Sequence, residues 1–335
     1  MTAPIMSGPL LEIADLRVRF DTDEGPVRAV DGLSFRMRHG EVFAMVGESG
    51  CGKTMTALSV LGLQPQGAKV SGSVRLDGRE LLTLSPRQLR DIRGRDISMV
   101  FQEPMTSLNP VFTVGRQIGE VLRRHQHLSR RDARSRAIEL LDLVRVPAAA
   151  SRIDEYPHQL SGGMRQRVMI AMAIACNPRL LIADEPTTAL DVTIQAQVLD
   201  ILRRLRADFG TAVLLITHNL GVVADIADRV LVMYAGLEVE QSEVDELFAK
   251  PQHPYTIGLL GAVPRPAADG VPGRLSEIPG MVPVLRSAPT ECVFAPRCSR
   301  AETDCHAAMP ALRDSHDGGH RVACLHPGRR EAVVS

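Results

Sequence analysis

The sequence predicts an α/β fold in which helices cover both faces of a parallel sheet, and a helical insert interrupts that core. A glycine-rich loop at 47–54 lies between an apolar run at 42–46 and a helical segment at 53–63. Three later apolar runs alternate with helical stretches, which is typical of parallel sheets. The runs lie at 180–183, 212–216 and 230–233, and the helices at 194–209 and 220–227.

The N-terminal part predicts an antiparallel β subdomain. Residues 10–20 and 27–37 have strand patterns and flank a charged hairpin loop at 21–26. A shorter strand pattern at 69–77 ends in a turn at Asp77-Gly78.

The helical insert extends from about 106 to 160. Segments 114–124 and 130–144 carry apolar residues at three- and four-residue spacing, which predicts two helices. Beyond Pro251 the chain becomes rich in proline and glycine and contains four of the six cysteines, so we expect a separate C-terminal module there.

The composition limits the possible functions. The chain has 335 residues, enough for one large or two ordinary domains. Its 39 lysine and arginine residues balance 39 aspartate and glutamate residues, so no global charge favours nucleic acid or acidic lipid. The arginine-rich stretch 123–136 alternates with apolar positions, and we interpret it as a solvated helix face rather than a polyanion site.

Membrane insertion and secretion are not indicated by the sequence. No apolar run approaches the roughly 20 residues that a membrane-spanning helix needs. The first residues, Met1-Thr2-Ala3-Pro4-Ile5, do not combine a basic region with an apolar core as a signal peptide does. We therefore expect a soluble, cytosolic chain that reaches a membrane only through a partner.

The glycine-rich loop has the complete pattern G-x-x-x-x-G-K-[ST], Gly47-Glu48-Ser49-Gly50-Cys51-Gly52-Lys53-Thr54. Between a buried strand and a helix N-terminus, backbone N–H groups and the helix dipole converge on an anion. The glycines let the main chain approach phosphates, Lys53 can reach the β- and γ-phosphates, and the Thr54 hydroxyl can ligate Mg²⁺. This context favours nucleoside triphosphate binding over a structural glycine turn.

Two further strand ends carry residues suited to triphosphate hydrolysis. Hydrolysis needs a second carboxylate for Mg²⁺ and a base that positions the attacking water. Asp184 and Glu185 follow the apolar run 180–183, which places Asp184 toward the metal and Glu185 toward the γ-phosphate. His218 follows the run 212–216, at the sheet edge where parallel sheets bind ligands, and is a candidate γ-phosphate contact. A surface acidic pair and a structural histidine are the alternatives.

A second anion site is predicted at Ser161. This serine can N-cap an apolar helix that we expect over 164–176, and Gly162 and Gly163 expose unpaired N–H groups at its start. Because the chain's own triphosphate occupies the first site, the second suits a nucleotide held by another subunit.

Together these motifs resemble the ATP-binding subunits of ABC transporters, which share the P-loop NTPase fold, over nearly all of residues 10–250. The resemblance makes 47–54 the Walker A loop, Gln102 the Q-loop glutamine, 160–167 the signature sequence, 182–185 the end of Walker B, 189–191 the D-loop and His218 the H-loop histidine. In this family two subunits enclose two ATP molecules, each between one Walker A loop and the opposing signature sequence.

The resemblance also implies roles for individual residues. Glu185, His218 and Gln102 would be catalytic, and Thr54, Asp184 and Gln102 would surround Mg²⁺. The nucleotide of the opposing subunit would contact Ser161, Gly162, Gly163 and Asp191. The chain's own ATP would stack on Phe20 and contact Gly47, Glu48, Ser49, Gly50, Cys51, Gly52, Lys53, Thr54 and Met55.

Three features resemble the oligopeptide/dipeptide importer branch of this family: the segment 101–110, Met164, and the segment 253–260. Asn219 and Leu237 depart from the family pattern, but neither touches the phosphate chemistry. The resemblance implies a nucleotide-binding domain at 10–250, with a helical subdomain at about 106–165, and a C-terminal extension at 251–335.

Four cysteines in the C-terminal segment, Cys292, Cys298, Cys305 and Cys324, have the spacing C-x5-C-x6-C-x18-C. Clustered thiols in a cytosolic chain favour metal over disulfides, and the spacing alone does not select the metal. The array resembles the cluster motif of peptide-importer ATPases, some of which hold a [4Fe–4S] cluster. We therefore favour an iron–sulfur cluster over zinc or free thiols, with zinc kept open by the nearby histidines His306, His316, His320 and His326. Cys51 and Cys176 are interpreted as packing residues, Cys176 within an apolar helix.

The resemblance implies the ATP-hydrolysing subunit of a bacterial ABC importer for oligopeptides or dipeptides, peripheral to the cytoplasmic face of the plasma membrane. Its expected partners are two transmembrane permeases, a second and different ATP-binding subunit and an extracytoplasmic solute-binding protein, with no nucleic acid. The region 103–160 would form the groove for the permeases' coupling helices.

Two alternatives remain open. The first is an importer of nickel, glutathione or another small solute of the same branch. The second is a soluble ABC ATPase of DNA repair or translation, which we disfavour because only 58 residues, without sustained heptads, separate Gln102 from Ser161 and the chain has one cassette.

Overall fold

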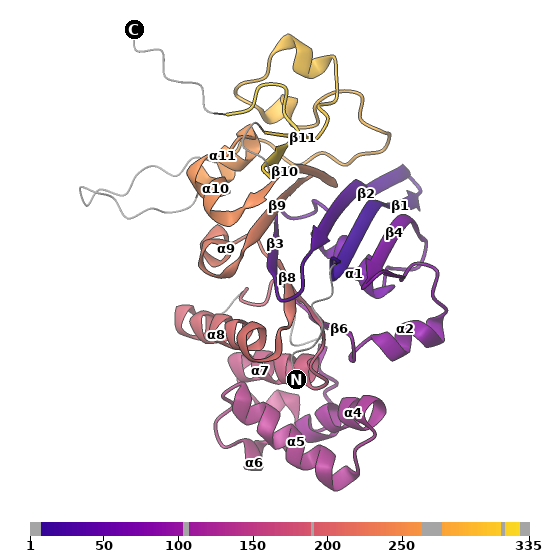
Figure 1. Cartoon of the computed structure of the whole chain (residues 1–335), viewed down its shortest axis with the longest axis vertical. Coiled ribbons are helices and arrows are strands. Elements are labelled where there is room, and N and C mark those ends of the chain that lie inside the picture. The colour runs from indigo at the N-terminus through magenta and orange to yellow at the C-terminus, as the bar shows by residue number, and fades with distance from the viewer. Residues whose placement is uncertain (1–7, 103–106, 189–190, 263–276, 316–318, 329–335) are drawn as a thin grey trace, which may run out of the picture. The chain divides into compact units, whose positions relative to one another are not determined.

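The computed structural model describes residues 8–102, 107–188, 191–262, 277–315 and 319–328 (Figure 1). The chain divides into two units. The first unit comprises residues 1–10, 37–42 and 76–216, and the second comprises residues 11–36, 43–75 and 217–335. None of the described helices is both long and apolar enough to span a bilayer.

Three parallel strands form the centre of the first unit: β6 (Ile97–Val100), β7 (Leu180–Asp184) and β8 (Ala212–Ile216). Leu180 of β7 pairs with Ile97 on one side and with Ala212 on the other. Every residue of β7 and β8 is buried, so their apolar runs reflect cover on both faces. The sequence predicts β7 and β8 but not β6, whose four residues include the polar Ser98.

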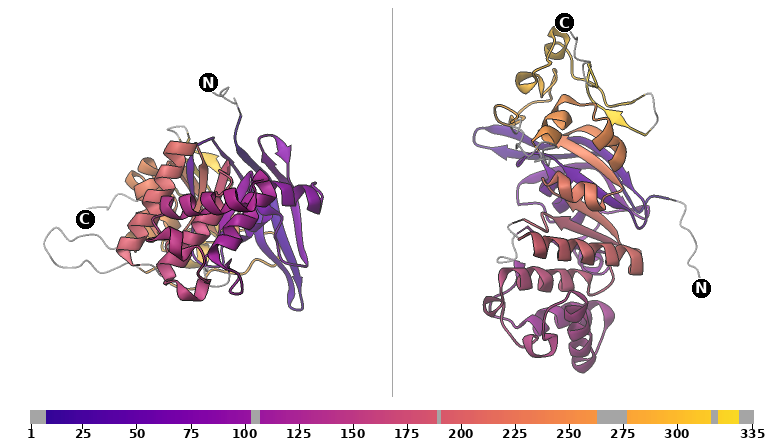
Figure 2. Two further views of the ribbon diagram at one scale, coloured as in Figure 1. Left: turned by 90° about the horizontal axis from the view of Figure 1, so that it is seen from below. Right: turned by 90° about the vertical axis from the view of Figure 1, so that its left-hand side faces the viewer.

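The remaining elements of the first unit are the two-residue strand β5 (Arg79–Glu80) and a set of helices. The helices are α2 (Pro86–Ile92), α4 (Val114–Gln126), α5 (Arg130–Leu143), α6 (Ala149–Arg152), the 3-10 turn η1 (Pro157–Gln159), α7 (Gly162–Ile174) and α8 (Val192–Phe209). Helices α4, α5 and α6 lie within the insert predicted at about 106–160, and α7 packs against α4 and α5 beyond its end (magenta to pink in Figure 2). Thr113 and Ser129 N-cap α4 and α5, which explains why these helices begin where they do.

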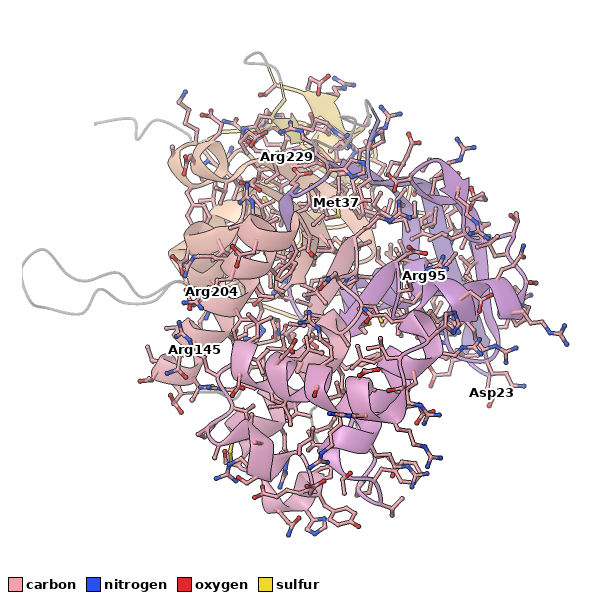
Figure 3. The ribbon with its side chains drawn as sticks, turned by 60° about the horizontal axis from the view of Figure 1, so that its bottom comes forward. Asp23, Met37, Arg95, Arg145, Arg204 and Arg229 are labelled. Carbon is pink, nitrogen blue, oxygen red and sulfur yellow. The ribbon has the colours of Figure 1, made fainter. Side chains whose placement is uncertain are left out.

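The arginine-rich stretch is a solvated helix face, as predicted. Arg124 pairs with Asp91 at 3.1 Å and Arg134 pairs with Asp154 at 2.6 Å, and all four side chains are exposed. Two further arginines, Arg145 and Arg204 (Figure 3), also form surface ion pairs, both with Asp200. Each of these four arginines therefore has an acidic partner at the surface.

Two sheets belong to the second unit. One contains, in spatial order, β2 (Gly25–Met37), β1 (Leu11–Thr22) and β4 (Ala68–Leu76). The other contains, in spatial order, β3 (Val42–Val46), β9 (Arg229–Tyr234), β10 (Leu237–Glu243), β12 (Arg321–Val322) and β11 (Arg313–Asp314). The helices of this unit are α1 (Lys53–Leu61), α9 (Leu220–Ile226), α10 (Val244–Ala249) and α11 (Pro254–Gly261), with 3-10 turns η2 (Ala295–Arg297) and η3 (Thr303–His306).

Several predicted boundaries are wrong. The hairpin loop expected at 21–26 is only Asp23-Glu24, because β1 and β2 extend to a turn that the Thr22 hydroxyl closes on the Gly25 carbonyl at 2.7 Å. The helix expected to reach residue 63 ends at Leu61, where Gly62 adopts the left-handed conformation. The helix expected at 164–176 spans Gly162–Ile174, so Cys176 lies beyond its end.

Strand β10 is absent from the predictions because it carries acidic residues. Glu240 is nevertheless fully buried in it, and its carboxylate accepts hydrogen bonds from the backbone N–H groups of Gln252 and His253 at 2.6 and 2.9 Å. His320 lies 2.7 Å from the same carboxylate. A buried carboxylate is tolerated when it is hydrogen-bonded this fully.

Candidate functional site

The glycine-rich loop lies in the second unit, between β3 and α1 (Figure 1). Gly47 has φ +152°, and a Cβ there would lie 2.3 Å from the Met233 carbonyl oxygen of β9. Gly52 has φ +99°, and a Cβ there would lie 2.3 Å from the Ala29 carbonyl oxygen of β2. Both glycines are therefore required for the backbone of the loop to pack against two strands.

Lys53 is buried, and the backbone of the loop curves around its side-chain amine. Its Nζ donates to the carbonyls of Gly47 and Glu48 at 2.7 and 2.9 Å. Cys51 is fully buried, and burial raises the pKa of its thiol although Lys53 lies close by, so it is a packing residue as predicted. Thr54 is exposed at the start of α1.

Glu48 of the loop makes two contacts that the sequence does not predict. Its backbone N–H donates to the Tyr255 hydroxyl at 2.8 Å, and its carboxylate pairs with both Nη atoms of Arg297 at 2.9 and 3.1 Å. The sequence marks the neighbourhood of Tyr255 only through the segment 253–260, and nothing local marks Arg297.

The acidic pair lies in the first unit, at the end of β7. Asp184 is 1% exposed and Glu185 is 9% exposed. Glu185 has φ +51°, its N–H donates to the Ile216 carbonyl at 2.8 Å, and its carboxylate accepts a hydrogen bond from the Thr188 hydroxyl. A non-glycine residue held in the left-handed region is strained, and such strain is concentrated at functional sites.

The serine–glycine motif and Asp191 lie at two neighbouring helix starts in the first unit. Ser161 N-caps α7, accepting from the Met164 N–H at 3.4 Å, and Asp191 N-caps α8, accepting from the Ile194 N–H at 2.9 Å. A Cβ on Gly163 would lie 3.3 Å from the Ile194 side chain, so the two helix starts pack closely. Negative charge is favoured at such helix N-termini.

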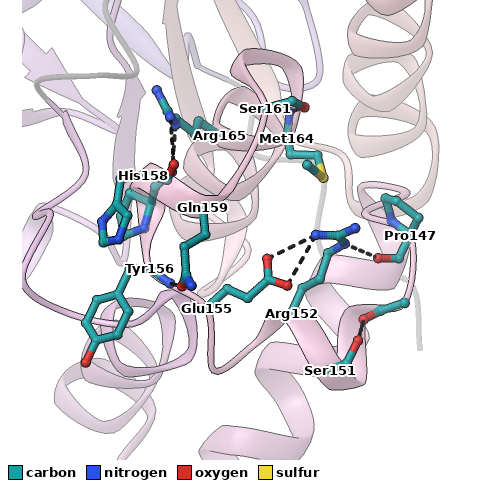
Figure 4. Close-up of polar contacts among 12 residues, drawn as sticks. Pro147, Ser151, Arg152, Glu155, Tyr156, His158, Gln159, Ser161, Met164 and Arg165 are labelled. Atoms are coloured by element: carbon teal, nitrogen blue, oxygen red, sulfur yellow. Dashed lines mark hydrogen bonds and ion pairs between the residues drawn. The ribbon is translucent and has the colours of Figure 1, made fainter.

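The chain before the serine is fixed by side-chain bonds to backbone carbonyls (Figure 4). Arg165 donates to the carbonyls of Pro157 and His158 at 2.7 and 3.4 Å. Arg152 pairs with Glu155 at 3.0 Å and donates to the Pro147 carbonyl. Arg165 thus joins the first turn of α7 to the residues just before Ser161.

The other predicted residues occupy exposed or half-buried positions. Gln102 is exposed just after β6, and Phe20 is half-buried on β1. His218 is exposed next to Thr217, whose N–H donates to the Met45 carbonyl of β3 at 3.2 Å. Asn219 N-caps α9, so the departure from the family pattern at this position preserves the helix start. Residues 103–106 of the Q-loop segment, Ala189 and Leu190 of the D-loop, and His316 lie outside the described residues.

The four C-terminal cysteines line one small cavity together with His326, and all six cysteines of the chain are free thiols. The Arg300 N–H points at the Cys298 sulfur at 3.3 Å. Burial raises the pKa of Cys292 and Cys298, and raises that of Cys324 to about 11. Neutral thiols are therefore favoured here unless a cation compensates the thiolate charge.

The comparisons with known proteins identify the family. Residues 30–188 match the family model described as ABC transporter, and residues 239–305 match the one described as oligopeptide/dipeptide transporter, C-terminal region. A putative peptide import ATP-binding protein of Brucella abortus (strain 2308) is 52% identical over 325 residues, which are 97% of each chain. This chain belongs to the ATP-binding subunits of ABC transporters.

Other relatives of this ABC ATPase support the same family assignment. The oligopeptide transport ATP-binding proteins AppD of Bacillus subtilis (strain 168) and OppD of Salmonella typhimurium (strain LT2) are 51% and 49% identical. The alignments cover 94% and 97% of this chain and 96% of each relative. The ATP-binding cassette MJ0796, solved as a dimer bound to ADP and Pi, has a TM-score of 0.64 at 27% identity and covers 70% of this chain and 98% of its own.

The family confirms the predicted fold class and the predicted activity. The fold is that of an ABC ATPase with an antiparallel β subdomain, and the chemistry is ATP hydrolysis. The predicted membership of the oligopeptide/dipeptide branch is confirmed as well.

Proposed function

We propose that this ABC ATPase supplies the energy for a bacterial importer of oligopeptides or dipeptides. The observation that carries the proposal is the match of residues 239–305 to the oligopeptide/dipeptide transporter C-terminal region, combined with a complete set of ATP motifs. Relatives named for peptide import or oligopeptide transport match almost the whole chain. ATP binding closes a dimer of subunits, and hydrolysis reopens it.

The roles of the individual residues follow from their chemistry. The Walker A loop holds the phosphates through backbone N–H groups and Lys53, and Thr54, Asp184 and Gln102 are suited to hold Mg²⁺, a hard cation that prefers oxygen ligands. Glu185 polarises the attacking water, and His218 contacts the γ-phosphate. The capped helix starts at Ser161 and Asp191, with Gly162 and Gly163, bind the nucleotide of the facing subunit.

The helical insert offers a receiving surface for the permeases. An open groove of about 720 Å³ lies on the first unit. Apolar and charged side chains share its lining: Asn109, Phe112, Gln117, Glu120, Val121, Arg123, Arg124, His125 and Met172. A short amphipathic helix from a membrane-spanning partner fits such a surface.

The assembly would therefore contain two permeases, a second ATP-binding subunit and a solute-binding protein, with this chain peripheral at the cytoplasmic membrane face. We favour a different second subunit, as this branch commonly pairs two. The nucleotide-binding domain would comprise 10–250, with its helical subdomain at about 106–165, and the extension 251–335.

Purification in detergent from a host that expresses the neighbouring genes tests the transport proposal. We expect multi-span permeases and a second ATPase to copurify with the chain. Recovery of ribosomes or DNA in place of membrane proteins would contradict it. Uptake of nickel or glutathione, and not of peptides, by the reconstituted complex would favour the small-solute alternative.

We propose that Cys292, Cys298, Cys305 and Cys324 hold a [4Fe–4S] cluster. Four free thiols around one cavity, with a backbone N–H aimed at a sulfur, fit such a group. Among the described residues, the group whose ligand atoms lie within 4.8 Å of one another is Asp304, Cys305 and His326 rather than the four cysteines. That set combines sulfur, oxygen and nitrogen ligands, which suit the alternative metal, zinc.

The colour of the protein tests the cluster. We expect a brown protein that absorbs at about 400 nm after anaerobic purification, with iron and sulfide in equal amounts. Replacement of Cys298 by serine should reduce the absorbance, whereas replacement of Cys176 should not. A colourless protein with stoichiometric zinc would exclude the cluster.

A further inference from the structure

The segment that contains the four C-terminal cysteines, 292–324 (the cysteine module), places a charged side chain against the glycine-rich loop at 47–54 (the phosphate loop). Arg297, next to Cys298, places Nη1 2.9 Å from one carboxylate oxygen of Glu48 and Nη2 3.1 Å from the other. The Arg297 side chain is 7% exposed and that of Glu48 is 28% exposed. A two-pronged pair of this kind is directional and is stronger than a single exposed ion pair.

Other groups hold Arg297 in this position. Its Nε donates to the Pro279 carbonyl at 2.7 Å, and Nη2 also donates to the Ile278 carbonyl at 3.2 Å. The guanidinium carbon lies 5.7 Å from the centre of the Tyr234 ring. The guanidinium is therefore held in place by protein groups alone.

A cluster of aromatic rings connects the loop to the cysteine module. The Tyr234 ring packs against Tyr255 and Phe294 at centroid distances of 4.8 and 5.2 Å. Tyr255 is fully buried and accepts the Glu48 N–H at 2.8 Å, and Phe294 follows Cys292 by two residues. The main chain of Glu48 is thus held by Tyr255 and its side chain by Arg297, both from the C-terminal part of the chain.

We propose that Arg297 is a positioning residue of the ATP site, which neutralises Glu48 and fixes the phosphate loop. A carboxylate in a loop that binds a polyanion repels the phosphates unless a cation compensates it. Arg297 supplies that cation from outside the loop, so Lys53 and the loop's backbone N–H groups other than that of Glu48 remain available for the nucleotide. The C-terminal extension thereby sets the affinity for ATP.

Nucleotide binding by the purified full-length chain tests this proposal. Replacement of Arg297 by glutamine should weaken ATP binding on the order of tenfold and AMP binding by less than about twofold, because the repulsion grows with the phosphate charge. Arg297→Lys should keep part of the ATP affinity, since it keeps the charge but loses the two-pronged geometry. The matched control is Arg286→Gln. Arg286 also lies in the C-terminal extension, its ion pair with Glu24 is exposed, and its loss should leave all affinities unchanged.

A double variant separates the electrostatic role from a merely structural one. If Arg297 acts through Glu48, the combination of Arg297→Gln with Glu48→Gln should recover most of the lost ATP affinity. Equal losses for ATP and AMP, additive effects in the double variant, or unchanged ATP affinity in a folded Arg297→Gln protein would each overturn the proposal. Thermal unfolding of every variant shows whether it is folded. The test does not depend on the transported solute, so its failure leaves the peptide-import proposal standing.

Discussion

At the scale of single residues, Glu185 combines burial with a backbone conformation that most residues avoid. Its φ of +51° costs on the order of 1–3 kcal/mol. The N–H bond to Ile216 and the Thr188 hydroxyl compensate part of this cost and aim the carboxylate. A residue that is held so tightly is suited to position a water molecule.

Replacement of Glu185 by glutamine should lower the rate of ATP hydrolysis by ~10²–10⁴, the range for loss of a positioned base. Glutamine keeps the shape and a hydrogen bond to Thr188 but cannot accept a proton, so ATP should remain bound and trap closed dimers. Phosphate release and gel filtration with ATP measure both effects. Near-normal hydrolysis would remove Glu185 from this role.

At the scale of elements, α11 begins at a buried histidine. His253 N-caps this helix, and its Nδ1 accepts the Tyr255 N–H at 3.1 Å, which requires an unprotonated Nδ1. Burial lowers the pKa of His253 to about 4, although Glu240 opposes the shift. The start of α11 is thus coupled to pH.

His253 should make the protein less stable in mild acid. Below pH ~6.5 the unfolded chain binds a proton at this position, but the folded chain does so only near pH 4, so stability falls as the pH falls between these values. The loss is on the order of 3 kcal/mol over that range. His253→Asn keeps the cap without titrating, and its denaturant-unfolding free energy should fall less steeply with acid. An exposed control, His158→Asn, should keep the original slope; the same slope in both variants would contradict the assignment.

At the scale of the whole chain, the C-terminal extension is joined to the rest of the second unit by hydrogen bonds as well as by sequence. β12 continues the sheet on β10, with Glu240 opposite Val322. His320 lies against the buried Glu240 carboxylate, and Arg321 pairs with Glu238 at 2.8 Å. Removal of the extension would leave an open strand edge and a buried charge without these partners.

Truncation after Lys250 should therefore destabilise the nucleotide-binding part. We expect a loss of about 3–5 kcal/mol, the cost of leaving the buried Glu240 side chain without its partners, together with aggregation through the exposed edge of β10. Thermal unfolding and light scattering measure the two effects. A soluble truncated chain with an unchanged midpoint would instead show that the extension is an independent domain.

Much of the local geometry of the candidate site was predictable because its signals are local. The glycine-rich loop, the acid pair after β7 and the capped start of α7 each lie within a few residues of one strand end or helix end. The local environment of such a motif nearly specifies its geometry. β10 could not be predicted in this way, since Glu240 is buried only because its partners come from residues 252, 253 and 320.

The sequence by itself determined the local strand–loop–helix geometry and the residues that we propose to hold ATP and Mg²⁺, because such motifs are encoded over about ten neighbouring positions. Only the tertiary structure decided what holds the phosphate loop in place. Arg297 and Glu48 are 249 residues apart, and no periodicity or motif connects them. Their pairing depends on the packing of Tyr234, Tyr255 and Phe294, which is a property of the folded chain and not of any local segment.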